Sequence, residues 1–381
     1  MSYHRTLDID LPPGQSAFLW GARQTGKSTY LRERFRDSVY VDLLDFDVVL
    51  RLSARPSRLG EELSSVPEAL SKPVIVDEIQ KVPGLLDEVH RLIESRRMAF
   101  VLCGSSARKV RHAGVNLLGG RAWRFEMFPL TWPEIPDFDL LRAMNDGLLP
   151  GIYGKPHAHR SLAAYVRDYL TQEIIQEALT RNAAAFLRFF EALRYCHGAL
   201  LNYSAIAADC GVSAKTVRTY FEIFQDTLVG YLIYPFHRRA GRQSISATPR
   251  FYLFDVGIAG HVCGRRLTAP GGAEFGRAFE HFILLEIIAS RSYQEKDFPI
   301  QFWRTKTKLE VDFVLGRGEV AVEVKSRVRR GDLRSMRAFM EEFAPRRAIV
   351  VSAANDRRRI DGIEIMPYAH FLRLLHAGEI L

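Results

Sequence analysis

Apolar residues in the first 140 positions fall into short runs separated by longer segments of mixed polarity. Four such runs, at residues 17–20, 39–44, 73–76 and 99–103, are rich in β-branched or aromatic side chains and have the length of buried strands. Strands that alternate with helical segments favour a parallel sheet covered by helices. The pattern therefore predicts an α/β domain in the first third of the chain.

The pattern changes after this domain. Prolines and glycines between residues 133 and 156 indicate a loop-rich junction. Apolar positions between residues 161 and 181 then recur with a helical period, which predicts a lid or connector helix. The sequence predicts four parts: an α/β core at 1–135, connector helices at 136–185, a winged helix at 186–254 and a second α/β domain at 255–381.

The loop between the first predicted strand and helix has a specific composition. Residues 21–28 read Gly-Ala-Arg-Gln-Thr-Gly-Lys-Ser and match the phosphate-binding pattern G-x-x-x-x-G-K-[ST] in its required strand-loop-helix context. In such a loop, backbone N–H groups converge on the β-phosphate, Lys27 reaches the β- and γ-phosphates, and the Ser28 hydroxyl binds Mg²⁺. A chance match is the alternative. The residues predicted to bind ATP are Gly21, Ala22, Arg23, Gln24, Thr25, Gly26, Lys27, Ser28 and Thr29.

Two acids follow the third predicted strand. Asp77 and Glu78 come directly after Pro-Val-Ile-Val, and open α/β sheets bind ligands at the carboxyl ends of their strands. We expect Asp77 to hold Mg²⁺, through water or through Ser28, and Glu78 to orient or deprotonate the water that attacks ATP. Two surface acids are the alternative, and the upstream loop favours the functional interpretation.

Two further positions are candidates for contact with the γ-phosphate. Ser105 or Ser106, at the end of the fourth predicted strand, could sense it, although a helix N-cap has the same composition. Arg121 follows a Gly-Gly pair and could reach the γ-phosphate of a neighbouring subunit as an arginine finger. A surface salt bridge is the alternative for Arg121.

Together these motifs resemble the AAA-type ATPase domain of a widespread prokaryotic family, in which a poorly characterised region follows the ATPase. The resemblance rests on the loop, Val-Ile-Val-Asp-Glu-Ile-Gln at 74–80, Cys-Gly-Ser-Ser at 103–106, Gly-Gly-Arg at 119–121 and Phe-Pro-Leu at 128–130. It implies an AAA+ P-loop ATPase with ATP and Mg²⁺ as cofactors, an arginine finger, and a ring-like or dimeric homo-oligomer.

Residues 203–221 predict a helix-turn-helix, in which a glycine closes the first helix and a serine caps the second. Lys215 and Arg218 lie early in the second helix, where recognition helices meet DNA. Residues 251–254 would supply a strand of a wing, after a basic segment at 238–242. A structural or protein-binding joint is the alternative to a DNA-binding role.

Polar and apolar residues alternate in two runs between residues 309 and 325, and a Gly-Arg-Gly segment joins the runs into a predicted hairpin. With a two-residue turn, residue 312 faces residue 321, and Asp312, Glu323 and Lys325 share one face. An unbulged three-residue loop would separate them, so the prediction depends on the register.

Divalent-metal phosphodiester chemistry uses such a cluster, with Asp312 and Glu323 on Mg²⁺ and Lys325 orienting or activating water. The spacing D-x10-E-x-K resembles the PD-(D/E)xK signature of restriction-endonuclease-like nucleases. Under this resemblance Glu280 matches the additional helix acid of the superfamily, and Val311 stands in place of the leading proline. The alternatives are a chance cluster, and the same fold without cleavage.

Charge adds a candidate partner. Lysine and arginine number 53 against 44 acidic residues, which gives a net charge of +9. Basic residues on both sides of the hairpin favour sequence-independent contact with the phosphates of duplex or branched DNA, and a solvated face is the alternative. They are Arg304, Lys306, Lys308, Arg327, Arg329, Arg330, Arg334 and Arg337.

The sequence has neither an amino-terminal signal pattern nor an apolar run of the ~18 residues that a membrane span needs, which predicts a cytoplasmic protein without a membrane partner. Its four cysteines are widely spaced and lack C-x-x-C pairs, so they predict buried apolar positions and not a zinc site or a disulfide framework.

The sequence as a whole predicts an ATP-hydrolysing, DNA-processing protein in which a P-loop ATPase is coupled to an Mg²⁺-dependent, nuclease-like domain. Two alternatives stay open. One is an ATP-driven switch or regulator whose nuclease-like domain binds DNA or a protein without cleavage, and the other is an ATP-driven protein remodeller. Salt-sensitive affinity for DNA would argue against the remodeller.

Overall fold

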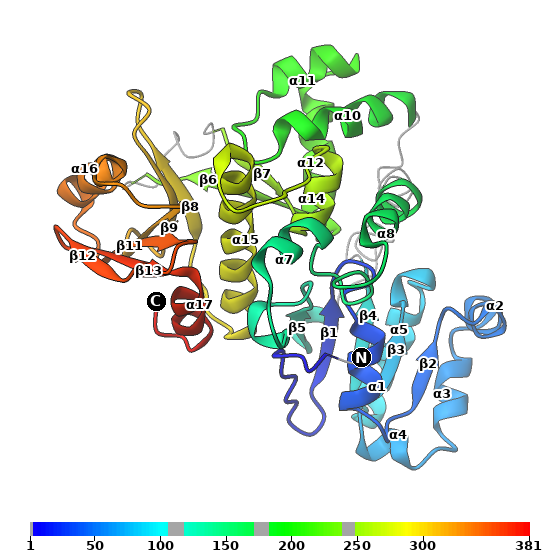
Figure 1. Cartoon of the computed structure of the whole chain (residues 1–381). Coiled ribbons are helices and arrows are strands. Elements are labelled where there is room, and N and C mark those ends of the chain that lie inside the picture. Colours follow the sequence, from blue (N-terminus) through cyan, green and yellow to red (C-terminus); the bar gives the residue numbers. More distant parts are fainter. Residues whose placement is uncertain (1–2, 106–117, 171–182, 238–247) are drawn as a thin grey trace. The chain divides into compact units, whose positions relative to one another are not determined.

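The chain forms two units in the computed structural model, which describes residues 3–105, 118–170, 183–237 and 248–381 (Figure 1). The amino-terminal unit contains residues 4–129 and the short segment 226–229, and the carboxyl-terminal unit contains the rest. Ser106, the second half of the predicted connector helix and the basic segment at 238–242 lie outside the described residues.

The amino-terminal unit is built on a five-stranded parallel sheet with strand order β2-β3-β4-β1-β5. Its strands are β1 (Ser16–Trp20), β2 (Tyr40–Asp42), β3 (Val74–Asp77), β4 (Phe100–Gly104) and β5 (Ala122–Glu126). Four of them coincide with the predicted apolar runs. The predicted parallel α/β sheet is therefore confirmed.

Helices bury the apolar side chains of this sheet. Phe18, Val76 and Leu102 of the strands belong to one core cluster with Leu63 and Leu92 of two helices. The helices and helical turns of this unit are α1 (Lys27–Arg34), α2 (Phe46–Ala54), α3 (Arg58–Leu63), α4 (Glu68–Ser71), η1 (Ile79–Lys81), α5 (Leu85–Arg96) and η2 (Leu118–Gly120).

The carboxyl-terminal unit contains an eight-stranded mixed sheet with strand order β12-β13-β11-β10-β9-β8-β6-β7. Strands β10, β11 and β13 are parallel neighbours, whereas β9 is antiparallel to both β8 and β10. The strands are β6 (Gly230–Pro235), β7 (Arg250–Leu253), β8 (Ile300–Arg304), β9 (Glu310–Leu315), β10 (Val320–Lys325), β11 (Arg347–Ser352), β12 (Arg358–Ile360) and β13 (Ile363–Pro367).

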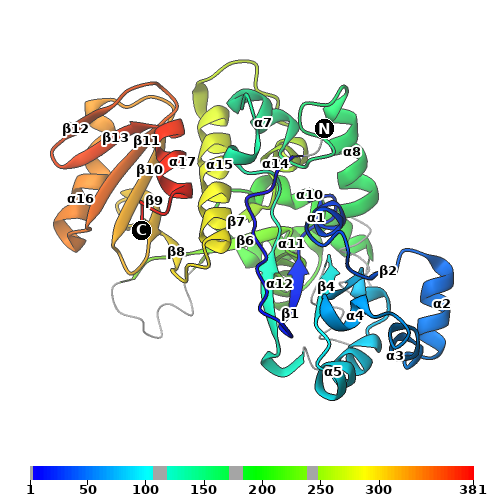
Figure 2. The same cartoon turned by 90° about the horizontal axis from the view of Figure 1, so that it is seen from below.

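Helices cover both faces of this second sheet. Helix α16 (Arg334–Phe343) packs Met336 and Phe339 against Val314, Ala321 and Val350 of the strands. Helices α15 (Gly272–Tyr293) and α17 (Tyr368–His376) lie on the other side, as Figure 2 shows. No helix of the described residues is both long and apolar enough to cross a membrane.

The remaining helices precede or flank this sheet. They are η3 (Trp132–Glu134), α7 (Leu140–Asp146), α8 (Ala158–Ala164), the π-helical turn η4 (Tyr165–Leu170), α10 (Ala183–Cys196), α11 (Tyr203–Cys210), α12 (Ala214–Asp226), α14 (Val256–Val262) and η5 (Arg330–Leu333). The described part of the predicted connector helix is thus α8 continued by η4.

Helices α11 and α12 form the predicted helix-turn-helix. Asn202 caps α11 by accepting from the Ala205 N–H at 3.1 Å, and Ser213 caps α12 by accepting from the Thr216 N–H at the same distance. Gly211 ends α11 with φ 67°, a left-handed conformation that glycine adopts readily.

Strands β6 and β7 connect the helix-turn-helix to the second sheet. They pair with each other as a wing would, and β6 also pairs in parallel with β8 through Tyr234 and Gln301. Because β6 and β8 share hydrogen bonds, the predicted boundary at residues 254 and 255 falls inside one continuous sheet.

Candidate functional site

The loop at residues 21–28 follows β1 and leads directly into α1. Gly26 has φ 94° and ψ 16°, and α1 begins at Lys27. The Lys27 Nζ donates to the carbonyl oxygens of Gly21 at 2.8 Å and Ala22 at 3.0 Å, and the Thr25 hydroxyl donates to the same Ala22 oxygen at 2.9 Å. The loop is thus curled around a buried ammonium group at a helix N-terminus, an arrangement suited to binding phosphate.

Asp77 lies at the carboxyl end of β3, on the same edge of the sheet as this loop. Its carboxylate accepts from the Tyr40 hydroxyl at 2.5 Å and from the Glu78 N–H at 3.0 Å. Burial and the Asp77 carboxylate both raise the pKa of Tyr40, so Tyr40 stays a hydrogen-bond donor. Burial also raises the pKa of the Cys103 thiol. The Asp77 carboxylate adds to this rise, and the Lys27 ammonium group opposes it. The structure therefore brings Asp77 near the loop.

Glu78 and Ser105 are linked by a third side chain, Gln80. The Gln80 Nε2 donates to a Glu78 carboxylate oxygen, and it lies 3.0 Å from the Ser105 Oγ. Ser105 follows Gly104, which pairs with Trp20, so Ser105 lies at the end of β4 beside the start of the loop. Sequence reasoning assigned no role to Gln80, although Gln80 ends the Val-Ile-Val-Asp-Glu-Ile-Gln segment at 74–80.

Arg121 lies at the opposite edge of the sheet from the loop. It precedes Ala122, which pairs with Ser16 at the start of β1, so the length of β1, about 16 Å at 3.3 Å per residue, separates the two edges. Its guanidinium pairs with Glu94 on the surface. Arg121 therefore does not reach the loop of its own chain, and a role toward a neighbouring subunit stays a prediction.

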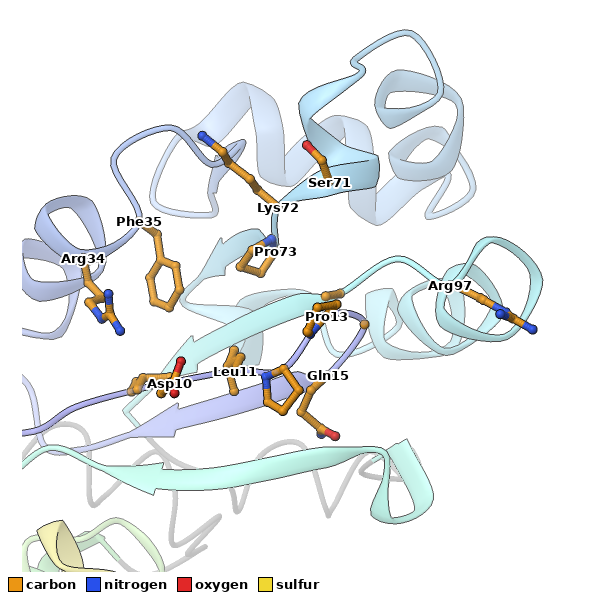
Figure 3. A pocket seen from close by; sticks show the side chains of 14 residues that line it. Asp10, Leu11, Pro13, Gln15, Arg34, Phe35, Ser71, Lys72, Pro73 and Arg97 are labelled. Carbon is orange, nitrogen blue, oxygen red and sulfur yellow. The ribbon is translucent and has the colours of Figure 1, made fainter.

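A pocket of about 330 Å³ lies at this same opposite edge, beside the residues that precede β1, β3 and β4. Its lining includes Pro13, Phe35, Pro73 and Arg97. Figure 3 shows the Arg97 side chain directed away from the other labelled residues. Because the phosphate-binding loop follows the carboxyl end of β1, this pocket is not the predicted nucleotide site.

The β9–β10 hairpin has a different turn from the predicted one. Four residues, 316–319, join the strands, and Leu315 pairs with Val320. Gly316 and Gly318 have φ 68° and 92°, conformations that allow this longer turn. The predicted two-residue turn is therefore wrong. Pairing in this register ends at Phe313 and Val322. Beyond it β9 is irregular, because Gln301 of β8 pairs with Val314 whereas Trp303 pairs with Val311. A shared face for Asp312 and Glu323 therefore stays a prediction.

These two acids are buried beside Lys325. Asp312 accepts from the Val324 N–H at 2.8 Å, and Glu323 Oε1 lies 2.8 Å from the Lys325 Nζ. Burial raises the pKa of Asp312 and raises that of Glu323 to about 7, although Lys325 opposes both shifts. Burial lowers the pKa of Lys325, but the two carboxylates outweigh it and raise the pKa overall.

Glu280 reaches the same region from α15, where it meets two residues that sequence reasoning missed. Its carboxylate accepts from the Tyr252 hydroxyl at 2.7 Å and lies 3.5 Å from Arg250 Nη1. Arg250 also pairs with Glu310. Burial, followed by repulsion from Asp312, raises the pKa of Glu280 to about 8. Arg250 had one signal, a charge directly before the apolar residues 251–254 of the predicted strand.

A hollow of about 710 Å³ opens beside this cluster. Lys325 lies on its wall, together with the exposed Arg327 and Arg329 and the first residues of α15. Two other basic residues of the predicted stripe are paired, Arg304 with Glu310 and Arg337 with Asp361. Lys306 and Lys308 are exposed but do not line the hollow, so only part of the predicted stripe lies there.

The donor set fits a divalent cation in part. Glu323 Oε2 is buried without a hydrogen-bond partner among the described residues, and raised carboxyl pKa values indicate negative charge without enough compensation. Carboxylate oxygens are ligands that Mg²⁺ prefers. Within the part of the chain that the structure describes, however, no three His, Cys, Asp or Glu side chains converge as a metal site.

Three protein families match successive parts of the chain. Residues 14–136 match an AAA domain. Residues 137–269 match a domain of unknown function (DUF8612), and residues 275–371 match another domain of unknown function (DUF4143). The first match agrees with the loop and the parallel sheet, so the amino-terminal unit holds a P-loop ATPase-type domain. The other two assign no activity to the carboxyl-terminal unit.

Similar whole proteins are uncharacterized. Uncharacterized proteins of Mycobacterium tuberculosis and Mycobacterium bovis are each 24% identical over 373 residues, which cover 95% of this chain and 82% of the relative. One of Haemophilus influenzae is 20% identical over 384 residues and 91% of each chain. Among solved structures, a Walker-type ATPase of Pyrococcus abyssi aligns with 65% of this chain and 90% of its own, at 15% identity and a TM-score of 0.41.

Proposed function

We propose that this chain is an ATPase whose carboxyl-terminal unit binds DNA and cleaves it in a metal-dependent reaction. One observation carries the proposal for the second unit: Asp312 and Glu323 are buried near Lys325, which lies on the wall of a basic hollow. ATP hydrolysis is supported separately by the AAA domain match and by the loop around Lys27.

In the first unit, Lys27 would exchange its two carbonyl partners for phosphate oxygens of ATP, and Ser28 and Asp77 would hold Mg²⁺. Glu78 would orient the attacking water, and the Ser105 hydroxyl would contact the γ-phosphate. A bound Mg²⁺ would neutralise charge that develops on the phosphates.

In the second unit, Asp312 and Glu323 would hold a divalent cation, which would activate water and stabilise the scissile phosphate. Lys325 would offset negative charge that develops on the phosphate. Arg327 and Arg329 would bind the flanking phosphates without reading base sequence. Glu280 would complete the acidic side of the site.

A second candidate is DNA binding without cleavage. One observation favours it: Arg250 already pairs with both Glu280 and Glu310. Since Lys325 pairs with Glu323, Asp312 alone of these four acids is not in an ion pair with a cation among the described residues. The ATPase would then act as a switch that changes how the second unit grips DNA.

Cleavage of linear and branched DNA in Mg²⁺ distinguishes these candidates. We expect Glu323→Gln and Lys325→Ala to lower the rate by about 100-fold or more, because each removes a group from the reacting centre. Glu319→Gln is the matched control, since Glu319 is an exposed acid in the turn of the same hairpin. Lys27→Ala should abolish ATP hydrolysis.

Each result has a distinct meaning. Cleavage that is equal in the wild type and both hairpin variants would overturn the nuclease proposal. Salt-sensitive binding without cleavage would favour the second candidate. Neither binding nor cleavage at any salt concentration would remove DNA from the proposal, and hydrolysis that survives Lys27→Ala would remove the ATPase.

A further inference from the structure

Gln80 joins two groups that ATP hydrolysis would use. It lies in the helical turn directly after Asp77 and Glu78, and its side chain is buried. Its amide nitrogen donates to both the Glu78 carboxylate and the Ser105 Oγ. One amide thus holds the predicted general base at the end of β3 and the predicted sensor at the end of β4.

Both hydrogen bonds have chemical consequences. A donor on one Glu78 oxygen fixes the orientation of the carboxylate and leaves the other oxygen for a water molecule. An N–H that donates to the Ser105 oxygen leaves the hydroxyl hydrogen of Ser105 available for an acceptor such as a phosphate oxygen. The arrangement therefore orients Glu78 as a hydrogen-bond acceptor and Ser105 as a hydrogen-bond donor.

The backbone around Glu78 is unusual. Glu78 has φ 61° and ψ 41°, a left-handed conformation that costs a residue with a side chain ~1–2 kcal/mol. Gln80 Oε1 is buried without a hydrogen-bond partner among the described residues. Strained backbone and unsatisfied polar atoms cluster at functional sites, where the surrounding structure over-determines them.

Gly104 leaves the space that this amide occupies. A Cβ at position 104 would collide with Gln80 Oε1 and would lie 2.7 Å from the Trp20 ring. The end of β4 therefore has no side chain at the point where the Gln80 amide lies between Glu78 and Ser105. A larger residue at position 104 would displace the amide.

We propose that Gln80 is a positioning residue for ATP hydrolysis. Its amide holds the Glu78 carboxylate and the Ser105 hydroxyl in fixed positions relative to each other. The proposal rests on the ATPase function proposed above. It assigns a role to a side chain that neither binds the phosphates nor contacts the attacking water.

Steady-state ATP hydrolysis tests this role. We expect Gln80→Ala to lower kcat by about 10- to 100-fold, less than the loss of a general base itself, with KM for ATP nearly unchanged. Gln80→Glu should lower kcat at least as far, since it replaces the amide donor between Glu78 and Ser105 with a carboxylate that cannot donate to either.

Three further variants separate positioning from general structure. Gly104→Ala should reproduce the kinetics of Gln80→Ala by displacing the amide. Gln80→Ala combined with Ser105→Ala should lose less activity than the sum of the single losses, since the two act as a unit. Ser16→Ala is the control: it removes a buried hydroxyl at the opposite edge of the sheet, which accepts from the Phe100 N–H at 3.0 Å, and should leave kcat unchanged.

The failures are distinguishable. If the wild type hydrolyses ATP and Gln80→Ala keeps its kcat, the role of Gln80 is overturned, whereas the ATPase proposal is unaffected. If the Gln80 and Ser105 losses simply add, or if KM rises as much as kcat falls, the positioning role is overturned and Gln80 only supports the fold. A wild type that binds ATP without hydrolysing it overturns both proposals.

Discussion

Two histidines lie side by side in the carboxyl-terminal unit, His281 buried and His197 partly buried. The ring centroids of His197 and His281 are 4.5 Å apart. His197 Nδ1 accepts from the Leu253 N–H at 3.3 Å, and His281 Nε2 lies 2.6 Å from the Leu253 carbonyl oxygen. Burial, followed by the nearby Arg265, lowers the pKa of His197 to about 3. Burial and His197 also lower the pKa of His281. Both imidazoles are therefore neutral in the folded chain.

This pair predicts acid sensitivity. Unfolded His197 takes up a proton near pH 6.5, whereas the folded residue does so only near pH 3, so stability is lost as pH falls through that window. We expect His197 alone to lower the free energy of unfolding by about 2 kcal/mol between pH 7.5 and pH 5. Urea denaturation of the wild type and His197→Gln measures it, with exposed His159→Gln as control. The same pH slope in all three proteins would contradict the prediction.

At the level of residues, a functional side chain could be predicted when the groups that it acts with are close to it in the sequence. The phosphate-binding loop was predictable because its groups are contiguous in the sequence. Gln80 and Arg250 were not, since Gln80 acts on Ser105 and Arg250 on Glu280 and Glu310, which only the fold brings near. The spacing of a motif predicts its acidic residues, but it does not identify a cation such as Arg250 that pairs with them in the fold.

The second helix of the helix-turn-helix presents a polar face. Lys215 and Arg218 are exposed near the start of α12, and the Arg218 guanidinium lies 4.9 Å from the Tyr203 ring centroid. The opposite face of α12 buries Val217, Phe221 and neighbouring apolar residues. An exposed basic helix start is suited to contact with DNA phosphates or base edges.

The DNA-binding hypothesis for this element predicts a change in salt dependence. If Lys215 and Arg218 contact phosphates, each alanine variant should weaken DNA binding for all sequences and reduce the slope of log K against log salt by about 1. Arg194→Ala removes a comparable guanidinium stacked on Tyr195 of α10 and is the control. Fluorescence anisotropy at several salt concentrations gives the slopes. Unchanged slopes would indicate a structural joint.

Helices and strands were predicted correctly where the hydrophobic period and the residues at the ends of the element indicate the same structure. The helix-turn-helix has a capping serine and a closing glycine, and the strand runs of the first sheet are short and apolar. The hairpin turn was mispredicted because two left-handed glycines at 316 and 318 allow several loop lengths. The pairing of β6 with β8 had no sequence signal, since partners in a sheet are chosen by tertiary packing.

At the scale of the whole molecule, the chain enters the amino-terminal unit twice. Residues 226–229 follow α12 and precede β6, yet they belong to the amino-terminal unit. Leu228 packs against the core of that unit, and its backbone is left-handed with φ 58°. Nothing in the composition of these four residues predicts this return, so the sequence suggested a simple succession of domains.

This segment predicts a coupling between the two units. We expect Leu228→Ser to lower the free energy of unfolding of the amino-terminal unit by about 1–2 kcal/mol, because a packed apolar side chain is replaced by a polar one. It should also weaken any effect of ATP on DNA affinity. Thermal unfolding and DNA titration with and without a non-hydrolysable ATP analogue measure both, with the exposed Leu187→Ser as control. A variant that behaves as the wild type in both assays would contradict the coupling.

The placement of residues 226–229 has a consequence for how such a protein can arise and be dissected. A gene fragment that stops after residue 129 would encode an ATPase domain that lacks Leu228, which packs against the core of that domain. The complementary fragment would contain Leu228 without the core against which it packs. Recombination at this single point should therefore damage both products. The two halves are expected to be inherited as one piece.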